Sequence, residues 1–275
     1  MLFRSLITFG GATAFEGHVP GATDKEGAYV EFGTATTITF AGGVSTAGGL
    51  LELYKAEGAA ITATDGAITQ SAAAAITVSA AAADHLNLEA ASSTMTAGGT
   101  DQLTITAHDL YGNTAVYTGD KLITFGGATA IEGHVPGATD TTGAYVEFGT
   151  ATTITFAGGV STAGGLLELY KAEGAAITAT DGAITQSAAA AITVSAAAIS
   201  KIVFTTSAQT ITQNEYSSVT TIQTQDAYGN ISNVTGSTAS IDLSTDSAQG
   251  KFYGSVGGAE ITSVDIAVEI GRAHV

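Results

Sequence analysis

Residues 122–198 repeat residues 6–82 almost letter for letter, 116 positions further along the chain. The three differing pairs are Phe15/Ile131, Lys25/Thr141 and Glu26/Thr142. A fixed period of this size predicts an array of one kind of domain, and one period is long enough to bury its own core. The repeat therefore sets the expected domain borders before any strand or helix is assigned.

The repeat divides the chain into three domains and a short tail. We expect a truncated domain over residues 1–82 that lacks its first strands, and a complete domain over residues 83–198. A third, diverged domain over residues 199–269 lacks its last strands. Residues 1–5 have no counterpart in the second copy and are treated as an arbitrary start. Residues 270–275 fit no part of the repeat, so we expect a non-native tail there.

Short segments between glycine-rich turns alternate apolar and polar side chains, which is the pattern of half-buried β-strands. Thr36–Phe40, His85–Glu89 and Leu103–Ala107 are clear examples. Alanine runs at 72–75 and 80–83 are not assigned to a helix, because they lack a helical apolar stripe and flank β-branched residues. Charged residues make up only 12% of the chain, about half the usual share, whereas exposed helices normally carry many. The expected fold class is all-β.

Two five-residue turns share the pattern Asp-x-Tyr-Gly-Asn, at Asp109–Asn113 and at Asp226–Asn230. Each follows a Thr-rich strand. Asp can cap a turn through its side chain, and Gly and Asn tolerate positive φ, so we expect Gly112 in that conformation. The residues expected to serve as structural turn residues are Asp109, Gly112, Asn113, Asp226, Gly229 and Asn230.

Together with Ala97-Gly98-Gly99-Thr100, Tyr117-Thr118-Gly119 and Ile177–Gly182, these turns resemble the immunoglobulin-like tandem repeats of bacterial surface and secreted proteins. The pattern is similar to invasin and intimin stalks and more loosely to filamin repeats. The resemblance implies tandem immunoglobulin-like β-sandwich domains with Greek-key connections. It also implies an extracellular, cell-surface or secreted location and a rod that spaces another domain from the cell. Neighbouring repeats of the same chain would be the partners, with a host surface protein or a glycan as a further one.

Composition excludes several classes of partner. The chain carries 8 basic and 25 acidic residues, a formal net charge of -17, which repels phosphate backbones and anionic lipid surfaces. We therefore expect no nucleic-acid partner. No apolar run is long enough to predict insertion of this segment into a membrane. The absence of cysteine excludes disulfides and thiolate metal sites but does not decide the compartment.

One loop in each copy combines acidic residues with a histidine. The set is Glu132, His134 and Asp140, mirrored by Glu16, His18 and Asp24. Such a mixture can bind a metal or transfer protons. One histidine without a second His or Cys is a poor transition-metal site, so a mobile surface loop is the simpler interpretation.

Calcium is a second metal candidate. Asp109 and Asn113 could offer oxygens to Ca²⁺ at a domain junction, with help from Asp84 or Asp181. Turn geometry alone explains the same residues. We therefore expect no catalytic residue, no metal ligand and no cofactor, with calcium at Asp109 and Asn113 as the alternative.

The leading hypothesis is a non-catalytic structural spacer, because nearly identical copies suit length and stiffness better than a unique pocket. The first alternative is a module that binds a glycan or protein. The aromatic platforms available for it are Tyr29, Tyr54, Tyr145 and Tyr170. The second alternative is an accessory region of a secreted polysaccharide-degrading enzyme.

Overall fold

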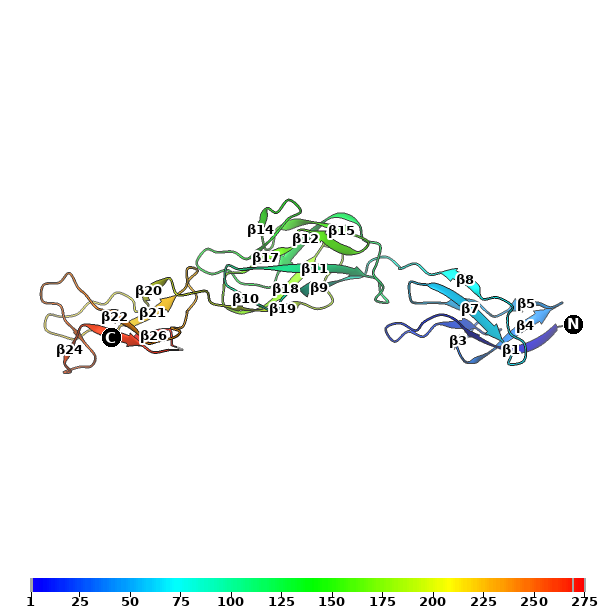
Figure 1. Ribbon diagram of the computed structural model, residues 1–275, viewed down its shortest axis with the longest axis horizontal. Coiled ribbons are helices and arrows are strands. Elements are labelled where there is room, and N and C mark those ends of the chain that lie inside the picture. The colour runs from blue at the N-terminus through cyan, green and yellow to red at the C-terminus, as the bar shows by residue number, and fades with distance from the viewer. Residues whose placement is uncertain (1, 269, 275) are drawn as a thin grey trace.

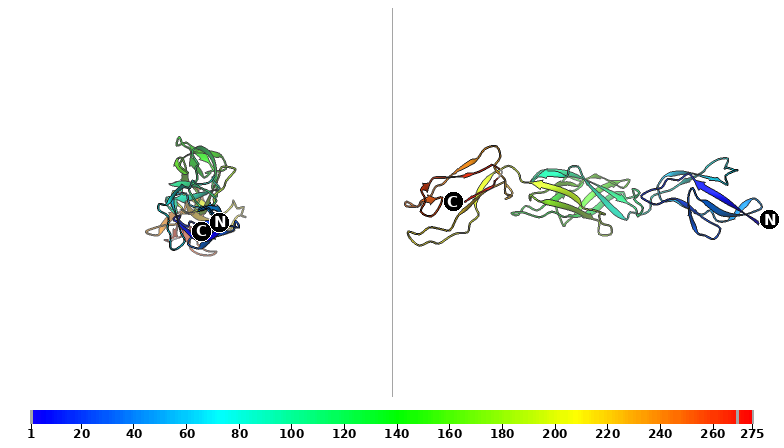
Figure 2. Two further views of the ribbon diagram at one scale, coloured as in Figure 1. Left: turned by 90° about the vertical axis from the view of Figure 1, so that its right-hand side faces the viewer. Right: turned by 90° about the horizontal axis from the view of Figure 1, so that it is seen from below.

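The computed structural model describes residues 2–268 and 270–274, and this part of the chain is all-β, without a helix. Three bodies follow one another in a line, and the two ends of the chain lie at opposite ends of it (Figure 1). A view along the line shows the three bodies largely superposed (Figure 2). The described residues contain no helix suited to crossing a membrane.

The middle body is a two-layer sandwich. Its strands are β9 (His85–Ala90), β10 (Thr94–Thr96), β11 (Thr100–His108), β12 (Gly119–Gly126), β13 (Gly137–Thr139), β14 (Tyr145–Glu147), β15 (Ala151–Ala157), β16 (Val160–Ala163), β17 (Leu166–Glu168), β18 (Gly174–Thr180) and β19 (Ala190–Ser195). One layer has the order β10-β19-β18-β12-β15-β16, and the other has β9-β11-β17-β13-β14. The two layers meet at one edge, where Thr106 of β11 pairs with Val160 of β16. Because the chain crosses repeatedly between two sheets of mainly antiparallel strands, the expected immunoglobulin-like sandwich is confirmed.

The core lies between these two layers and follows the alternation of each strand. On β11, Leu103, Ile105 and Ala107 are completely buried, while the residues between them face outward. The largest buried side chains facing them include Ile123, Phe125, Ile154, Phe156, Ile177 and Ile192. The period-2 pattern of the sequence is thus the pattern of burial.

The first body contains β1 (Leu2–Gly10), β2 (Gly21–Thr23), β3 (Tyr29–Glu31), β4 (Ala35–Ala41), β5 (Val44–Ala47), β6 (Leu51–Glu52), β7 (Gly58–Thr64) and β8 (Ala74–Thr77). Residues 2–5, which have no counterpart in the repeated sequence, extend β1 along β4 as far as the pair Leu2 with Ala41. β7 begins at Gly58 and pairs with β8 as an antiparallel hairpin.

The third body contains β20 (Lys201–Phe204), β21 (Thr221–Gln225), β22 (Ala239–Asp242), β23 (Phe252–Tyr253), β24 (Glu260–Ile261), β25 (Ser263–Ile266) and β26 (Arg272–His274). β25 pairs with β22 as β15 pairs with β12 in the middle domain. The sequence predicts this strand over Ser263–Glu269, of which Glu269 lies outside the described residues. Although we excluded residues 270–275 from the fold, β26 pairs with β21, in the place that β16 takes beside β11.

We predict that residues 84–198 fold alone, because this segment holds both layers and its own buried core. A protein of these residues should show a β-type circular dichroism spectrum and one cooperative thermal transition. A helical spectrum, or a gradual melt without cooperativity, would contradict the domain borders.

Candidate functional site at the domain junctions

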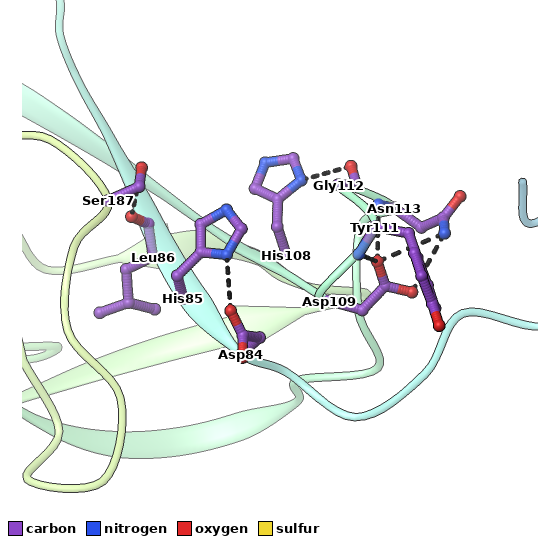
Figure 3. Close-up of polar contacts among 9 residues, drawn as sticks. All are labelled: Asp84, His85, Leu86, His108, Asp109, Tyr111, Gly112, Asn113 and Ser187. Carbon is purple, nitrogen blue, oxygen red and sulfur yellow. Dashed lines mark hydrogen bonds and ion pairs between the residues drawn. The ribbon is translucent and has the colours of Figure 1, made fainter. Parts of the chain in front are cut away.

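The two Asp-x-Tyr-Gly-Asn turns lie at the junctions between neighbouring domains. In the first, Asp109 Oδ1 accepts hydrogen bonds from the backbone N–H groups of Tyr111, at 3.0 Å, and Asn113, at 2.9 Å. Gly112 has a φ of 90° and its counterpart Gly229 a φ of 96°, a conformation that favours glycine. The carboxylate thus organises a tight turn at the end of β11 (Figure 3).

The side chain of Asn113 reaches from this turn into the first domain. Its Nδ2 donates to the carbonyl of Tyr54 at 2.7 Å, and its Oδ1 accepts from the N–H of Ala56 at 2.7 Å. Asp109 Oδ2 accepts from the N–H of Ala81, in the linker, at 2.9 Å. Asp109 and Asn113 are both buried. The turn therefore fixes the preceding domain and the linker together.

The second junction repeats these contacts. Asn230 Nδ2 donates to the carbonyl of Tyr170 at 2.7 Å, and Asn230 Oδ1 accepts from the N–H of Ala172 at 2.7 Å. Asp226 Oδ2 accepts from the N–H of Ala197 at 2.9 Å. The same polar arrangement thus holds each pair of neighbours, although the third domain has diverged in sequence.

Three aromatic rings, one of them histidine, pack together beside each turn. In the first junction His18, Tyr54 and Tyr111 have ring centroids 4.9 to 5.2 Å apart. His134, Tyr170 and Tyr228 repeat the cluster in the second, at 5.1 to 5.2 Å. His18 and His134 are exposed, as expected for surface loops, but each ring also packs against a tyrosine of the next domain.

The ring of Tyr228 also explains why position 98 of the middle domain is a glycine. A Cβ added to Gly98 would lie 1.8 Å from the Tyr228 hydroxyl oxygen, so only glycine leaves room for this ring. Tyr228 packs against the core of the middle domain from its position in the third. The turn at Ala97-Gly98-Gly99 is thus part of the docking surface.

Charge is distributed differently in the two junctions. Lys201 of the third domain donates to Glu132 of the middle domain at 2.8 Å. In the first junction the equivalent carboxylate is Glu16, and His85 takes the position of Lys201.

The carboxyl of Asp226 has a lowered pKa. Burial raises this pKa, but hydrogen bonds from the Asn230 side chain and from three backbone N–H groups outweigh the effect of burial and leave the pKa below its usual value.

The other acidic candidates serve their own turns. Asp24 and Asp140 accept backbone hydrogen bonds from residues two and four positions later. Asp181 accepts from the Tyr117 hydroxyl at 2.5 Å and from its own turn, and Asp84 lies 3.2 Å from the His85 ring. Among the described residues, no three His, Asp or Glu side chains gather as metal ligands as they lie. The oxygens proposed for Ca²⁺ on Asp109 and Asn113 accept N–H groups instead.

The proposed aromatic platforms divide into two pairs. Tyr54 and Tyr170 belong to the ring clusters, and burial raises the pKa of the Tyr54 hydroxyl to about 12, so it stays neutral. Tyr29 and Tyr145 remain partly exposed, and their hydroxyls donate to the carbonyls of Val19 and Val135.

Sequence reasoning identified the turns but missed the groups they hold. Tyr54 and Ala56 contribute backbone atoms, which carry no side-chain signature. One signal was present: the turn survives in the diverged third domain, together with the tyrosine and histidine of the domain before it. Because the turn is retained in one domain, and the tyrosine and histidine in the domain before it, these residues point to a contact between the two domains.

No family model matches the chain, and no curated protein matches it significantly. Among solved structures, the Escherichia coli adhesin FdeC is 18% identical, with 98% of this chain and 79% of that chain covered and a TM-score of 0.37. Yersinia pseudotuberculosis InvD is 16% identical, with coverages of 100% and 71% and a TM-score of 0.33. Invasin, a bacterial integrin-binding protein, is 14% identical, with coverages of 100% and 56% and a TM-score of 0.33. At such identities and TM-scores, these matches transfer no function to this chain.

We predict that Gly112→Val destabilises the chain by about 1–3 kcal/mol, because valine is strained at positive φ. Its Cβ would also lie 3.1 Å from Glu16 Cγ of the first domain. Urea denaturation measures the change. Gly174→Val is the matched control, since Gly174 begins β18 at an ordinary φ with open space around its Cβ. Equal effects of the two substitutions would contradict the strain argument.

The lowered pKa of Asp226 predicts how the second junction responds to acid. A carboxyl whose pKa is depressed by folding stabilises the folded state above its unfolded pKa of about 3.9, and this contribution is lost as pH falls through the folded value. Carbon-13 NMR should give a midpoint for Asp226 below about 3.9. The amide proton of Ala197, which bonds Asp226, should shift over the same pH range. A midpoint at or above the usual value would contradict the hydrogen-bond account.

Proposed function

We propose that this chain is a non-catalytic spacer segment of a bacterial adhesin-like protein, located at the cell surface or secreted. The observation that carries the proposal is that both junctions use the same three hydrogen bonds, at the same distances of 2.7, 2.7 and 2.9 Å. A spacer requires each domain to hold the next in a reproducible way. The straight succession of the three bodies supports this role (Figure 1).

The short linkers support the same conclusion. Between the last strand of one domain and the first of the next lie only a few residues, mostly alanine. Ala81 and Ala197 within them are bonded to Asp109 and Asp226. A linker that is both short and bonded leaves neighbouring domains little freedom to fold back on one another.

The groups that could act as acids, bases or binding platforms are largely engaged in the junctions. His18 and His134 pack in the ring clusters, and Glu132 pairs with Lys201. Tyr54 and Tyr170, two of the four proposed aromatic platforms, are half-buried and pack in the same clusters. This use of the candidate residues favours a spacer over a catalytic or glycan-binding module.

Small-angle scattering of the full chain tests the proposal. Each sandwich should add roughly 35–45 Å, for about eleven extended residues at about 3.3 Å each. The maximum dimension should therefore be about three times that of one domain. Asn113→Ala with Asn230→Ala removes the bonds to Tyr54, Ala56, Tyr170 and Ala172, and we expect a shorter and broader distance distribution.

Asn233→Ala is the matched control, because Asn233 is exposed and lies outside the turn. It should leave the scattering unchanged. A compact wild-type particle would contradict the spacer function, and so would hydrolase activity on polysaccharide or peptide that is lost in His134→Ala. Unchanged scattering in the double variant would show that the asparagines do not set the arrangement.

A further inference from the structure

The first junction differs from the second at two positions that lie side by side on neighbouring strands. His85 on β9 pairs with His108 on β11, whereas Lys201 on β20 pairs with Gln225 on β21 in the third domain. In the second junction, Lys201 reaches across to Glu132 of the preceding domain. A permanent cation is thus replaced by imidazole in the first junction.

A cleft of about 410 Å³ lies at this first junction. Glu16 and His18 line it from the first domain, and His85, His108 and Tyr111 line it from the second. In the second junction, the lysine at the position of His85 bonds the carboxylate at the position of Glu16. The cleft therefore brings imidazoles of one domain to a carboxylate of the other.

One nitrogen of each paired imidazole is directed at an acceptor. His108 Nδ1 lies 2.7 Å from the carbonyl oxygen of Gly112, and His85 Nδ1 lies 3.2 Å from Asp84 Oδ2 (Figure 3). These acceptors favour the tautomer with hydrogen on Nδ1, which leaves a lone pair on each Nε2. Metal-binding histidines usually have this arrangement, with the second nitrogen donating to a carboxylate or a carbonyl.

The spacing of the two rings suits a shared ion. Their centroids are 5.7 Å apart, and their planes differ by 15°. With Zn–N bonds of about 2.0–2.1 Å, each nitrogen about 1.1 Å from its ring centre and the tetrahedral angle usual for zinc, two imidazoles on one ion have centres about 5.2 Å apart. The observed rings are only slightly further apart than this, so they must turn about their side-chain bonds and approach a little to share an ion.

We propose that Nε2 of His85 and Nε2 of His108 bind a divalent transition metal such as Zn²⁺, with Glu16 of the preceding domain as the third ligand. As the described side chains lie, no three ligands converge, so the Glu16 carboxylate must turn toward the histidines on binding. The ion would link the first two domains, as the Lys201–Glu132 pair links the next two. The site would bind metal whether or not the chain serves as a spacer.

Calorimetric titration of the tag-free full chain with zinc chloride at pH 7.5 tests this. We expect one ion per chain, and at least a tenfold loss of affinity in His85→Gln and in His108→Gln. Glu16→Gln should also weaken binding. His134→Gln, in the second junction, is the matched control and should bind as the wild type does. NMR of the wild-type imidazoles gives a measurement without substitution, in which zinc should perturb Nε2 of His85 and His108.

Wild-type affinity in the His85 and His108 variants would overturn the site, as would an equal loss in His134→Gln. Wild-type affinity in Glu16→Gln alone would overturn the link between domains. Imidazole signals of His85 and His108 that do not respond to zinc would overturn the proposal irrespective of how the variants fold.

Discussion

The contact between neighbouring domains depends on one asparagine side chain, which forms hydrogen bonds to backbone groups as the edge of a β-strand would. Asn113 offers one donor and one acceptor, and these match the carbonyl of Tyr54 and the N–H of Ala56 in the neighbouring domain. Asp109 is buried and needs hydrogen bonds to its carboxylate, and one of them comes from the linker at Ala81. Folding of the turn and docking of the preceding domain are therefore coupled.

The charge of the chain acts in the same direction as these bonds. A formal net charge of -17, spread over three domains, opposes any arrangement that brings domains side by side, most strongly at low ionic strength. In the junctions, the carboxylates of Asp109 and Asp226 bond to uncharged backbone N–H groups of the linkers and not to other acidic side chains. Lys201 with Glu132 adds an exposed ion pair worth about 0–1 kcal/mol. Specific contacts set the position of each domain, while repulsion disfavours compact alternatives.

The features that could be predicted from the sequence are those that leave a periodic pattern of apolar and polar residues. Strands such as Leu103–Ala107 alternate because one face is buried, so fold class and most strands followed directly. The junction was hidden for a physical reason: Asn113 meets Tyr54 and Ala56 through backbone atoms far away in the chain, and no spacing rule describes such a contact. The approach of His18 to Tyr111 was missed for the same reason. Burial within a domain leaves a pattern, whereas docking between domains leaves single residues.

The middle domain carries both halves of the junction at its two ends. Its turn at Asp109–Asn113 holds the first domain, and Tyr170 and Ala172 receive the turn of the third. An interface that joins two different surfaces head to tail does not close on itself, so it can be repeated without limit. Of the three positions that differ between the copies, Phe15, with its counterpart Ile131, is the one beside the Asp109–Asn113 turn, where it lies close to Gly112. Near-identity of the copies therefore preserves the junction together with the core, and copy number can change without a new interface.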